Sequence, residues 1–246
     1  MRIPRIYQPV TLSSGQQLEL LPDAAHHVLN VLRMKDGQAL ILFNGEGGQF
    51  DVLVERAGKR RVEVRIGEHH QQDCESPLHF TLVQGISRGK HMDLTLQKAV
   101  ELGVSRIVPV HSEFSNIRLD PEQQRKRLEH WRRVVIAACE QCGRNRLPVI
   151  EAPQSLPEWL AGDEDALKLI LHPRADASPV DIHQQPTRVI LLAGPEGGFS
   201  NEECDLAKTH GYLAIRLGPR ILRTETAALV ALAACQTLWG DLRTGE

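Results

Sequence analysis

The sequence carries no strong net charge and no long apolar run. Its 29 Lys and Arg nearly balance 31 Asp and Glu, giving a formal net charge of −2 over 246 residues. This balance excludes a globally basic, nonspecific nucleic-acid binder, although a specific one can still cluster its cations locally. The longest apolar run, residues 227–235, is far shorter than a membrane-spanning helix. The opening stretch is charged and interrupted by proline, so no signal peptide is expected.

Several common functional motifs are also missing. Neither Gly-x-Gly-x-x-Gly at a strand–helix junction nor Gly-x-x-x-x-Gly-Lys-Ser/Thr occurs, which argues against a nucleotide-dependent oxidoreductase or kinase. No Gly-x-Ser-x-Gly elbow indicates a serine hydrolase. The five cysteines are an odd number and fit reduced cytosolic thiols. Cys139-x-x-Cys142 has no second pair at ligand spacing, so we interpret it as a buried, reduced pair and expect no metal.

Residues 1–72 have the pattern of a small β-domain. Short alternating runs joined by turns that contain glycine favour a small barrel. The expected strands are 17–21, 39–44, 49–55 and 61–66. A short helix is expected over 24–32, with Asp23 as its N-cap. The polar, unpatterned stretch 69–77 is interpreted as a linker to a second domain that covers the rest of the chain, 73–246.

From residue 78 onward, apolar strand patterns alternate with helical ones, which predicts an α/β domain with a parallel sheet. The expected strands are 78–85, 106–110, 167–172, 189–193 and 213–217, and the expected helices are 92–102, 121–142, 201–210 and 226–242. Ser200 with Glu203 has capping-box spacing, and Thr224 or Thr226 is expected to cap the last helix. That helix is apolar on almost every side, so we expect it in a subunit interface or, equally, in a large core.

Two glycine-bearing loops organise the second domain. Gly194-Pro-Glu-Gly-Gly198 follows the apolar run 188–193, and the loop from Leu217 follows the run 212–217. Open α/β sheets bind ligands beyond the carboxyl ends of their strands, and glycine lets backbone N–H and C=O groups approach a flat ligand. Because the Glu196 carboxylate would repel a pyrophosphate, these loops predict a small neutral or cationic ligand.

Basic residues are expected at the same edge of the sheet. They follow the first and third predicted strands, end the long helix and occupy the second loop. The predicted set is Arg88, Lys90, Arg144, Arg146, Arg174, Arg220 and Arg223. Positive charge gathered at one edge of a slightly acidic protein favours a polyanionic substrate there, although each of these charges alone could be a solvated surface group.

Five ordered motifs together resemble the RsmE family, SPOUT-class methyltransferases that act on N3 of a uridine in 16S, small-subunit ribosomal RNA. The motifs are Ser87-Arg-Gly-Lys90, Gln97-Lys-Ala-Val-Glu-Leu-Gly103, Glu140-Gln-Cys-Gly-Arg144, Gly194-Pro-Glu-Gly-Gly198 and Leu217-Gly-Pro-Arg-Ile-Leu-Arg-Thr-Glu-Thr226. The opening Arg2-Ile-Pro-Arg-Ile-Tyr7 is similar as well. The resemblance covers essentially the whole chain.

The resemblance implies a fold that the patterns alone do not give. Residues 1–72 would be a PUA-like, RNA-binding barrel, and 73–246 a SPOUT domain with a deep trefoil knot threaded by 194–200 and 217–226. Topology rules alone predict a plain open sheet, since knots are nearly absent from proteins. The resemblance also implies a homodimer packed through the knot, S-adenosylmethionine as the cofactor and 16S ribosomal RNA as the partner. The cysteines and the composition, separately, predict a cytoplasmic protein.

For that cofactor and substrate, the resemblance implies cofactor-binding, RNA-binding and catalytic roles for the candidate residues. The cofactor-binding set is Leu171, His172, Gly194, Pro195, Glu196, Gly197, Gly198, Leu217, Gly218, Leu222 and Thr224. The RNA-binding set is Arg5, Arg33, Arg88, Lys90, Arg144 and Arg146. The catalytic candidates are Arg223, then Arg144, to stabilise charge on the base, and Glu196. Glu196 or Glu225 could accept a proton or could fix a loop. A non-enzymatic RNA-binding or ribosome-assembly protein is the alternative.

Overall fold

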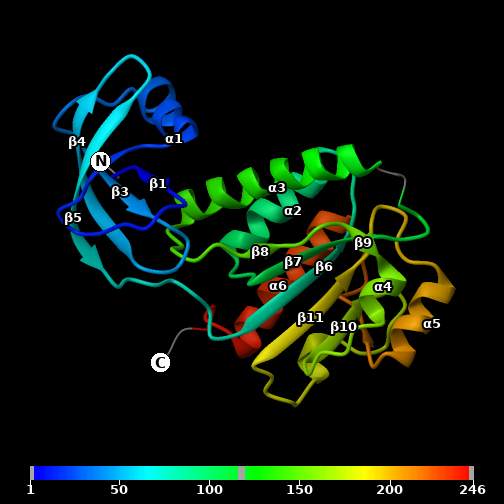
Figure 1. Ribbon diagram of the computed structural model, residues 1–246. Helices are drawn as coiled ribbons and strands as arrows, with labels where there is room; N and C mark the ends of the chain where they lie inside the picture. Colours follow the sequence, from blue (N-terminus) through cyan, green and yellow to red (C-terminus); the bar gives the residue numbers. More distant parts are fainter. Residues whose placement is uncertain (1–2, 116–119, 244–246) are drawn as a thin grey trace. The chain divides into compact units, whose positions relative to one another are not determined.

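The computed structural model describes residues 3–115 and 120–243, so Arg2 of the opening motif lies outside the described part (Figure 1). The chain divides into two compact units. Unit 1 comprises Met1–Glu75 together with Cys139–Leu147, and unit 2 comprises Ser76–Ala138 together with Pro148–Glu246. The sequence pattern gives no sign that residues 139–147 belong to unit 1.

Unit 1 is built on a five-stranded sheet with the order β1-β3-β4-β5-β2. Its strands are β1 (Arg5–Tyr7), β2 (Gln17–Glu19), β3 (Ala39–Phe43), β4 (Gln49–Ala57) and β5 (Val62–His70). β1 runs parallel to β3, and the other pairs are antiparallel. The alternation of β4 and β5 places Val52, Val54, Val62, Val64 and Ile66 in one apolar core under the sheet.

Three details of unit 1 differ from the sequence-based expectation. β1 is too short to show a pattern of its own and is held by its register against β3. β5 continues through His70, because His69 and His70 pair with Phe50 and Gln49 of β4, so the expected linker begins later than residue 69. The helix α1 (Pro22–His26), which continues as a π-turn over His27–Val31, starts at a proline, and Asp23 lies in its first turn rather than at its N-cap.

Unit 2 contains a seven-stranded sheet with the order β12-β10-β11-β6-β7-β8, and β9 also pairs with β7. Its strands are β6 (His79–Gly85), β7 (Arg106–His111), β8 (Val149–Ile150), β9 (Gln154–Ser155), β10 (Leu167–Leu171), β11 (Arg188–Ala193) and β12 (Leu213–Ile215). Every recorded pair in this sheet is parallel, which confirms the predicted parallel α/β sheet. The carboxyl ends of β6, β10, β11 and β12 therefore lie at one edge.

Helices cover both faces of this sheet (Figure 1). The helices are α2 (Lys90–Glu101), α3 (Pro121–Cys142), α4 (Leu156–Leu160), α5 (Asn201–Thr209), α6 (Thr224–Trp239) and the 3-10 turn η2 (Pro179–Asp181). α4 and α5 share one apolar cluster with the sheet, and α2 and α6 pack against each other on the opposite face. Among the described residues, no helix is long and apolar enough to cross a membrane.

The helix caps decide where the site loops end. Ser200 accepts from the Glu203 backbone N–H and forms a capping box, as predicted. The expected threonine cap of α6 is wrong, because Arg223 occupies the N-cap position without a side-chain cap.

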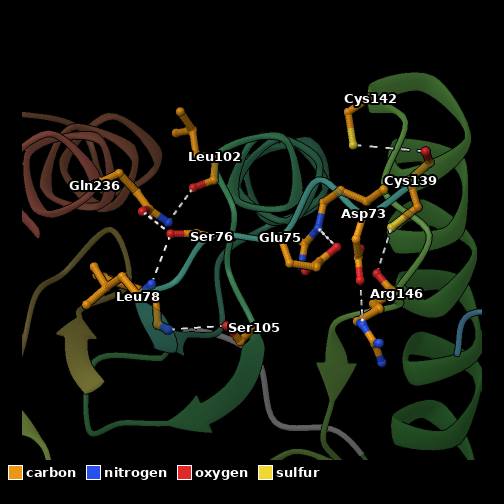
Figure 2. Close-up of polar contacts among 12 residues, drawn as sticks. Asp73, Glu75, Ser76, Leu78, Leu102, Ser105, Cys139, Cys142, Arg146 and Gln236 are labelled. Carbon is orange, nitrogen blue, oxygen red and sulfur yellow. Dashed lines mark hydrogen bonds and ion pairs between the residues drawn. The ribbon is translucent and has the colours of Figure 1, made fainter. Parts of the chain in front are cut away.

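The buried face of α6 also holds the polar Gln236, which donates to the Leu102 carbonyl (3.0 Å) and accepts from Ser76 Oγ (2.6 Å) (Figure 2).

Candidate functional site

The two glycine loops line one cavity of about 500 Å³ at the carboxyl edge of the unit 2 sheet. Residues from the end of β10, the loop after β11 and the segment between β12 and α6 form its walls. All of the residues predicted to hold a cofactor line it, namely Leu171, His172, Gly194, Pro195, Glu196, Gly197, Gly198, Leu217, Gly218, Leu222 and Thr224. The prediction that the two loops meet at one edge is therefore confirmed by the geometry.

Glycine is required where these loops pack tightly. A Cβ on Gly85, at the end of β6, would lie 2.4 Å from Pro195 Cδ, and one on Gly194 would lie 3.0 Å from Gly198 Cα. Gly198 and Gly218 adopt φ values of 72° and 75°, in the left-handed region. The loops therefore present bare backbone to the cavity, which suits hydrogen bonding to the edge of a flat ligand.

A buried amide fixes the two loops to each other. The Thr224 hydroxyl at the start of α6 donates to the Gly194 carbonyl (2.5 Å). Gln84 Nε2, fully buried at the end of β6, donates to Thr224 Oγ1 (3.2 Å) and to Gly194 O (3.3 Å). Gln84 is not among the predicted site residues, although a polar residue at the end of an apolar strand indicates a partner at that edge.

The Glu196 carboxylate is engaged in a contact that fixes its loop. Its Oε1 accepts the backbone N–H of Arg88 (2.9 Å), so the loop after β11 is tied to the segment before α2. This contact agrees with the loop-fixing role that the sequence predicts for Glu196 as an alternative to proton transfer. The side chains of Arg88, just before α2, and of Lys90, its first residue, are exposed and can meet a polyanion.

A histidine and a second glutamate meet on the cavity wall. Nδ1 of His91, in the first turn of α2, lies 3.1 Å from Oε1 of Glu225, in the first turn of α6. Both residues line the cavity, with 43% of the His91 side chain and 10% of the Glu225 side chain exposed. Arg223 and Arg220 line it too, whereas Arg174 follows β10 on the surface. His91 is a functional candidate that its sequence position did not reveal.

Arg144 does not have the accessibility that either of its predicted roles needs. Its side chain is 4% exposed in unit 1, and its Nε donates to Glu75 Oε1 (3.0 Å) while Nη2 contacts the second carboxylate oxygen. Burial pushes the pKa of the guanidinium down, but the Glu75 carboxylate outweighs it, so the pKa is raised above its usual value. We therefore correct the assignment of Arg144 to charge stabilisation and to RNA binding.

The other unit 1 cations differ in availability. Arg5 is half-buried: it donates to Gln49 and to Asn145 Oδ1 (2.5 Å) and lies over the Phe43 ring, which contradicts a free phosphate-binding side chain. Arg33 is exposed, and Arg146 is exposed with its Nε 2.8 Å from Asp73 (Figure 2). Arg33 and Arg146 therefore keep the accessibility that an RNA contact requires.

The Cys139-x-x-Cys142 pair lies at the end of α3. Cys139 is buried, and desolvation raises the pKa of its thiol to about 12. Its Sγ lies 3.9 Å from the Arg146 carbonyl, and Cys142 Sγ lies 4.0 Å from the Cys139 carbonyl (Figure 2). A thiol held protonated by burial is a poor metal ligand and a poor nucleophile.

These features define an α/β protein with a glycine-lined ligand cavity at the carboxyl edge of a parallel sheet, joined to a small β-unit. Residues 74–236 match the RNA methyltransferase domain family, and residues 20–67 match the RNA methyltransferase PUA domain. The chain belongs to this RNA methyltransferase family.

Individual relatives agree along the whole chain. The ribosomal RNA small subunit methyltransferase E of Buchnera aphidicola subsp. Schizaphis graminum is 37% identical over 242 residues and covers 98% of each chain. A Legionella pneumophila structure described as a methyltransferase with bound SAM is 45% identical, with a TM-score of 0.96 over 98% of this chain and 100% of that one. The SAM-bound ribosomal RNA small subunit methyltransferase E of Neisseria gonorrhoeae is 42% identical, with a TM-score of 0.91 and the same coverage.

Proposed function

We propose that the protein is an S-adenosylmethionine-dependent methyltransferase that modifies N3 of a uridine in 16S, small-subunit ribosomal RNA. The observation that carries this proposal is the single cavity formed by both glycine loops, in a chain whose solved relatives hold SAM. The names of the relatives support ribosomal RNA of the small subunit as the substrate.

The residues of the cavity fit this cofactor. A cavity of about 500 Å³ lies within the range that small-molecule sites occupy. Leu171, Leu217 and Leu222 supply apolar surface for the faces of an adenine, and the bare backbone of Gly194 and Gly198 can hydrogen-bond its edge. The site lacks a phosphate-binding motif, and this ligand carries no phosphate. When bound, the cofactor supplies a methyl group activated by a positive sulfur.

Within this site, Arg223 is the residue placed to act on the base. It is exposed at the N-cap of α6 and lines the cavity, so its guanidinium can stabilise negative charge that develops on O2 or O4 of the uracil ring. Methyl transfer is an in-line displacement, in which most acceleration comes from positioning and from fixed charges. Arg223 therefore contributes electrostatics rather than proton transfer.

The two parts of the chain divide the work. We assign RNA binding to residues 1–72, of which 20–67 match the PUA domain, and methyl transfer to residues 73–246, of which 74–236 match the methyltransferase domain. The exposed Arg33, Arg88, Lys90 and Arg146 contact phosphates and set the register on the RNA. A uridine within folded RNA is turned outward to reach the cavity.

We further infer a trefoil knot and a homodimer. The two loops that would thread the knot, 194–200 and 217–226, both contribute to the cavity wall, which supports a close crossing. The homodimer packs through this region, where Ile221 is 90% exposed and Val230 on α6 is also exposed. The protein works in the cytoplasm, which fits five free thiols.

Titration calorimetry tests the cofactor first. Saturable binding of S-adenosylmethionine, with no binding of NADH or ATP, is the expected result. Arg223→Ala should abolish methylation of small-subunit RNA while cofactor affinity stays within about threefold, and Arg223→Lys should restore part of the activity. Arg243→Ala, an exposed arginine beyond α6, is the matched control. RNA binding without cofactor binding would favour the non-enzymatic RNA-binding protein instead.

A further inference from the structure

Glu225 is the one buried acidic residue in the part of the chain that the structure describes. Its side chain is 10% exposed, and it lines the cavity from the first turn of α6. Burying a carboxylate is costly unless it is paired, and the positive end of a helix dipole offsets only part of that cost. The buried Glu225 carboxylate costs stability, and its place on the wall of a ligand cavity points to a role in the chemistry of that cavity.

The contacts of Glu225 leave capacity to accept a proton. Within residues 3–115 and 120–243, the structure records one side-chain partner, His91, whose Nδ1 lies 3.1 Å from Oε1. The other glutamate of the cavity, Glu196, instead accepts a backbone N–H and is committed to fixing its loop. A base oriented on one oxygen by a neighbouring side chain is the arrangement that general-base catalysis uses.

We propose that Glu225 is the catalytic residue that accepts the N3 proton of the target uridine, and that His91 is a positioning residue that orients it. This inference rests on the proposed function. The N3–H bond breaks and its proton passes to a Glu225 oxygen. The electron pair on N3 then forms the bond to the methyl carbon, while the electron pair of the carbon–sulfur bond stays on sulfur, which leaves as a neutral thioether.

Charged side chains share the cavity wall with the His91–Glu225 pair. The charged and titratable side chains that line the same cavity are Arg216, Arg220, Arg223, Glu196 and His172. Arg88, just before α2, and Lys90, the first residue of α2, are exposed. Protonation of His91 adds a positive charge 3.1 Å from the carboxylate and makes it a weaker base.

The decisive variant is Glu225→Gln in the full-length protein. Single-turnover methylation of small-subunit ribosomal RNA should slow by about 100-fold or more, while the S-adenosylmethionine Kd stays within about threefold by calorimetry. The residual rate should rise in proportion to hydroxide concentration, because no protein base remains. Glu202→Gln, an exposed glutamate in the first turn of α5, is the matched control. An equal loss of cofactor affinity would overturn the proposal and make Glu225 a binding or structural residue.

Variants of His91 separate orientation from proton transfer. His91→Ala should lower kcat by about tenfold. His91→Asn keeps a neutral hydrogen-bond donor beside Glu225, so it should retain more activity than His91→Ala. A loss in His91→Ala as large as that in Glu225→Gln would transfer the proton-acceptor role to the histidine and overturn our assignment. Cofactor binding by wild type without any methyl transfer to ribosomal RNA would instead mean that the proposed function itself has failed.

Discussion

The Thr224 hydroxyl, at the start of α6, donates a hydrogen bond of 2.5 Å to the carbonyl oxygen of Gly194, at the end of β11. The buried Gln84 amide donates to the same hydroxyl at 3.2 Å. Thr224 and Gly194 lie on different walls of the cavity, so this bond fixes the distance between the two loops that form it.

Thr224→Val should therefore weaken cofactor binding. The valine keeps the shape of the side chain but leaves Gly194 O without its hydroxyl donor, which costs about 1–2 kcal/mol and corresponds to a roughly 5- to 30-fold higher Kd for S-adenosylmethionine. Thr224→Ser keeps the hydroxyl and should bind within about threefold of wild type. Calorimetric titration of both variants checks this, and equal affinities for the serine and valine variants would contradict it.

Gly85→Ala should displace the loop after β11, which contains Gly194 and Pro195. The added Cβ would lie 2.4 Å from Pro195 Cδ and 2.9 Å from Gly194 C, so the loop after β11 has to move. We expect a loss of about 1–3 kcal/mol in the free energy of unfolding, together with weaker cofactor binding. Gly58→Ala, whose nearest contact would be 3.3 Å, is the control in urea titrations. The prediction fails if both variants unfold at the same urea concentration.

The cavity could be predicted from the sequence because its signals are local. Gly194 and Gly218 each follow an apolar run, and the alternating strands and helices place both loops at one edge of a parallel sheet. The partners of those loops could not be predicted in the same way. Gln84 and Thr224 are 140 positions apart, as are Arg5 and Asn145 in unit 1, and no periodicity links such pairs.

The membership of Cys139–Leu147 in unit 1 also depends on contacts between residues far apart in the sequence, so it could not be predicted either. α3 continues without a break from Pro121 to Cys142, so the helical pattern gives no sign that its last turn leaves unit 2. The segment joins unit 1 through tertiary contacts, including the Tyr7 N–H to Glu140 Oε1 bond of 2.9 Å. Arginines that look alike in the sequence thus separate into the buried Arg144 and the exposed Arg146.

That separation predicts that two neighbouring substitutions destabilise the protein to different extents. Arg144→Met leaves the Glu75 carboxylate without its buried partner and should lower the free energy of unfolding by about 3 kcal/mol. Arg146→Met removes an exposed ion pair with Asp73 and should cost less than about 1 kcal/mol. Urea unfolding measures both values. The double variant Arg144→Met with Glu75→Leu should recover part of the loss, and no recovery would contradict the ion-pair explanation.

The cysteines should differ sharply in reactivity. Desolvation raises the pKa of both the Cys139 and Cys235 thiols to about 12, whereas Cys74 is exposed. Since the thiolate is the reactive species, iodoacetamide at pH 8 should label Cys74 and leave the two buried thiols unmodified until the protein is unfolded. Peptide mass spectrometry, with and without urea, measures the extent of labelling at each cysteine. Labelling of Cys139 in the native protein at the rate of Cys74 would show that α3 opens near its end.

Glu140 predicts a pH dependence of stability. Burial raises the pKa of its carboxyl above the usual 4.5, and the hydrogen bond from the Tyr7 backbone opposes that shift only in part. A raised folded-state pKa means that the native state binds the proton more tightly than the unfolded chain, so this contribution is present below pH 4.5 and is lost as pH rises through the folded value. Glu140→Gln keeps an acceptor for the Tyr7 N–H but does not ionise. The variant should therefore gain stability relative to wild type between about pH 4.5 and pH 8, measured by urea unfolding at several pH values. A difference that stays constant over this range would show that Glu140 ionises equally easily in both states.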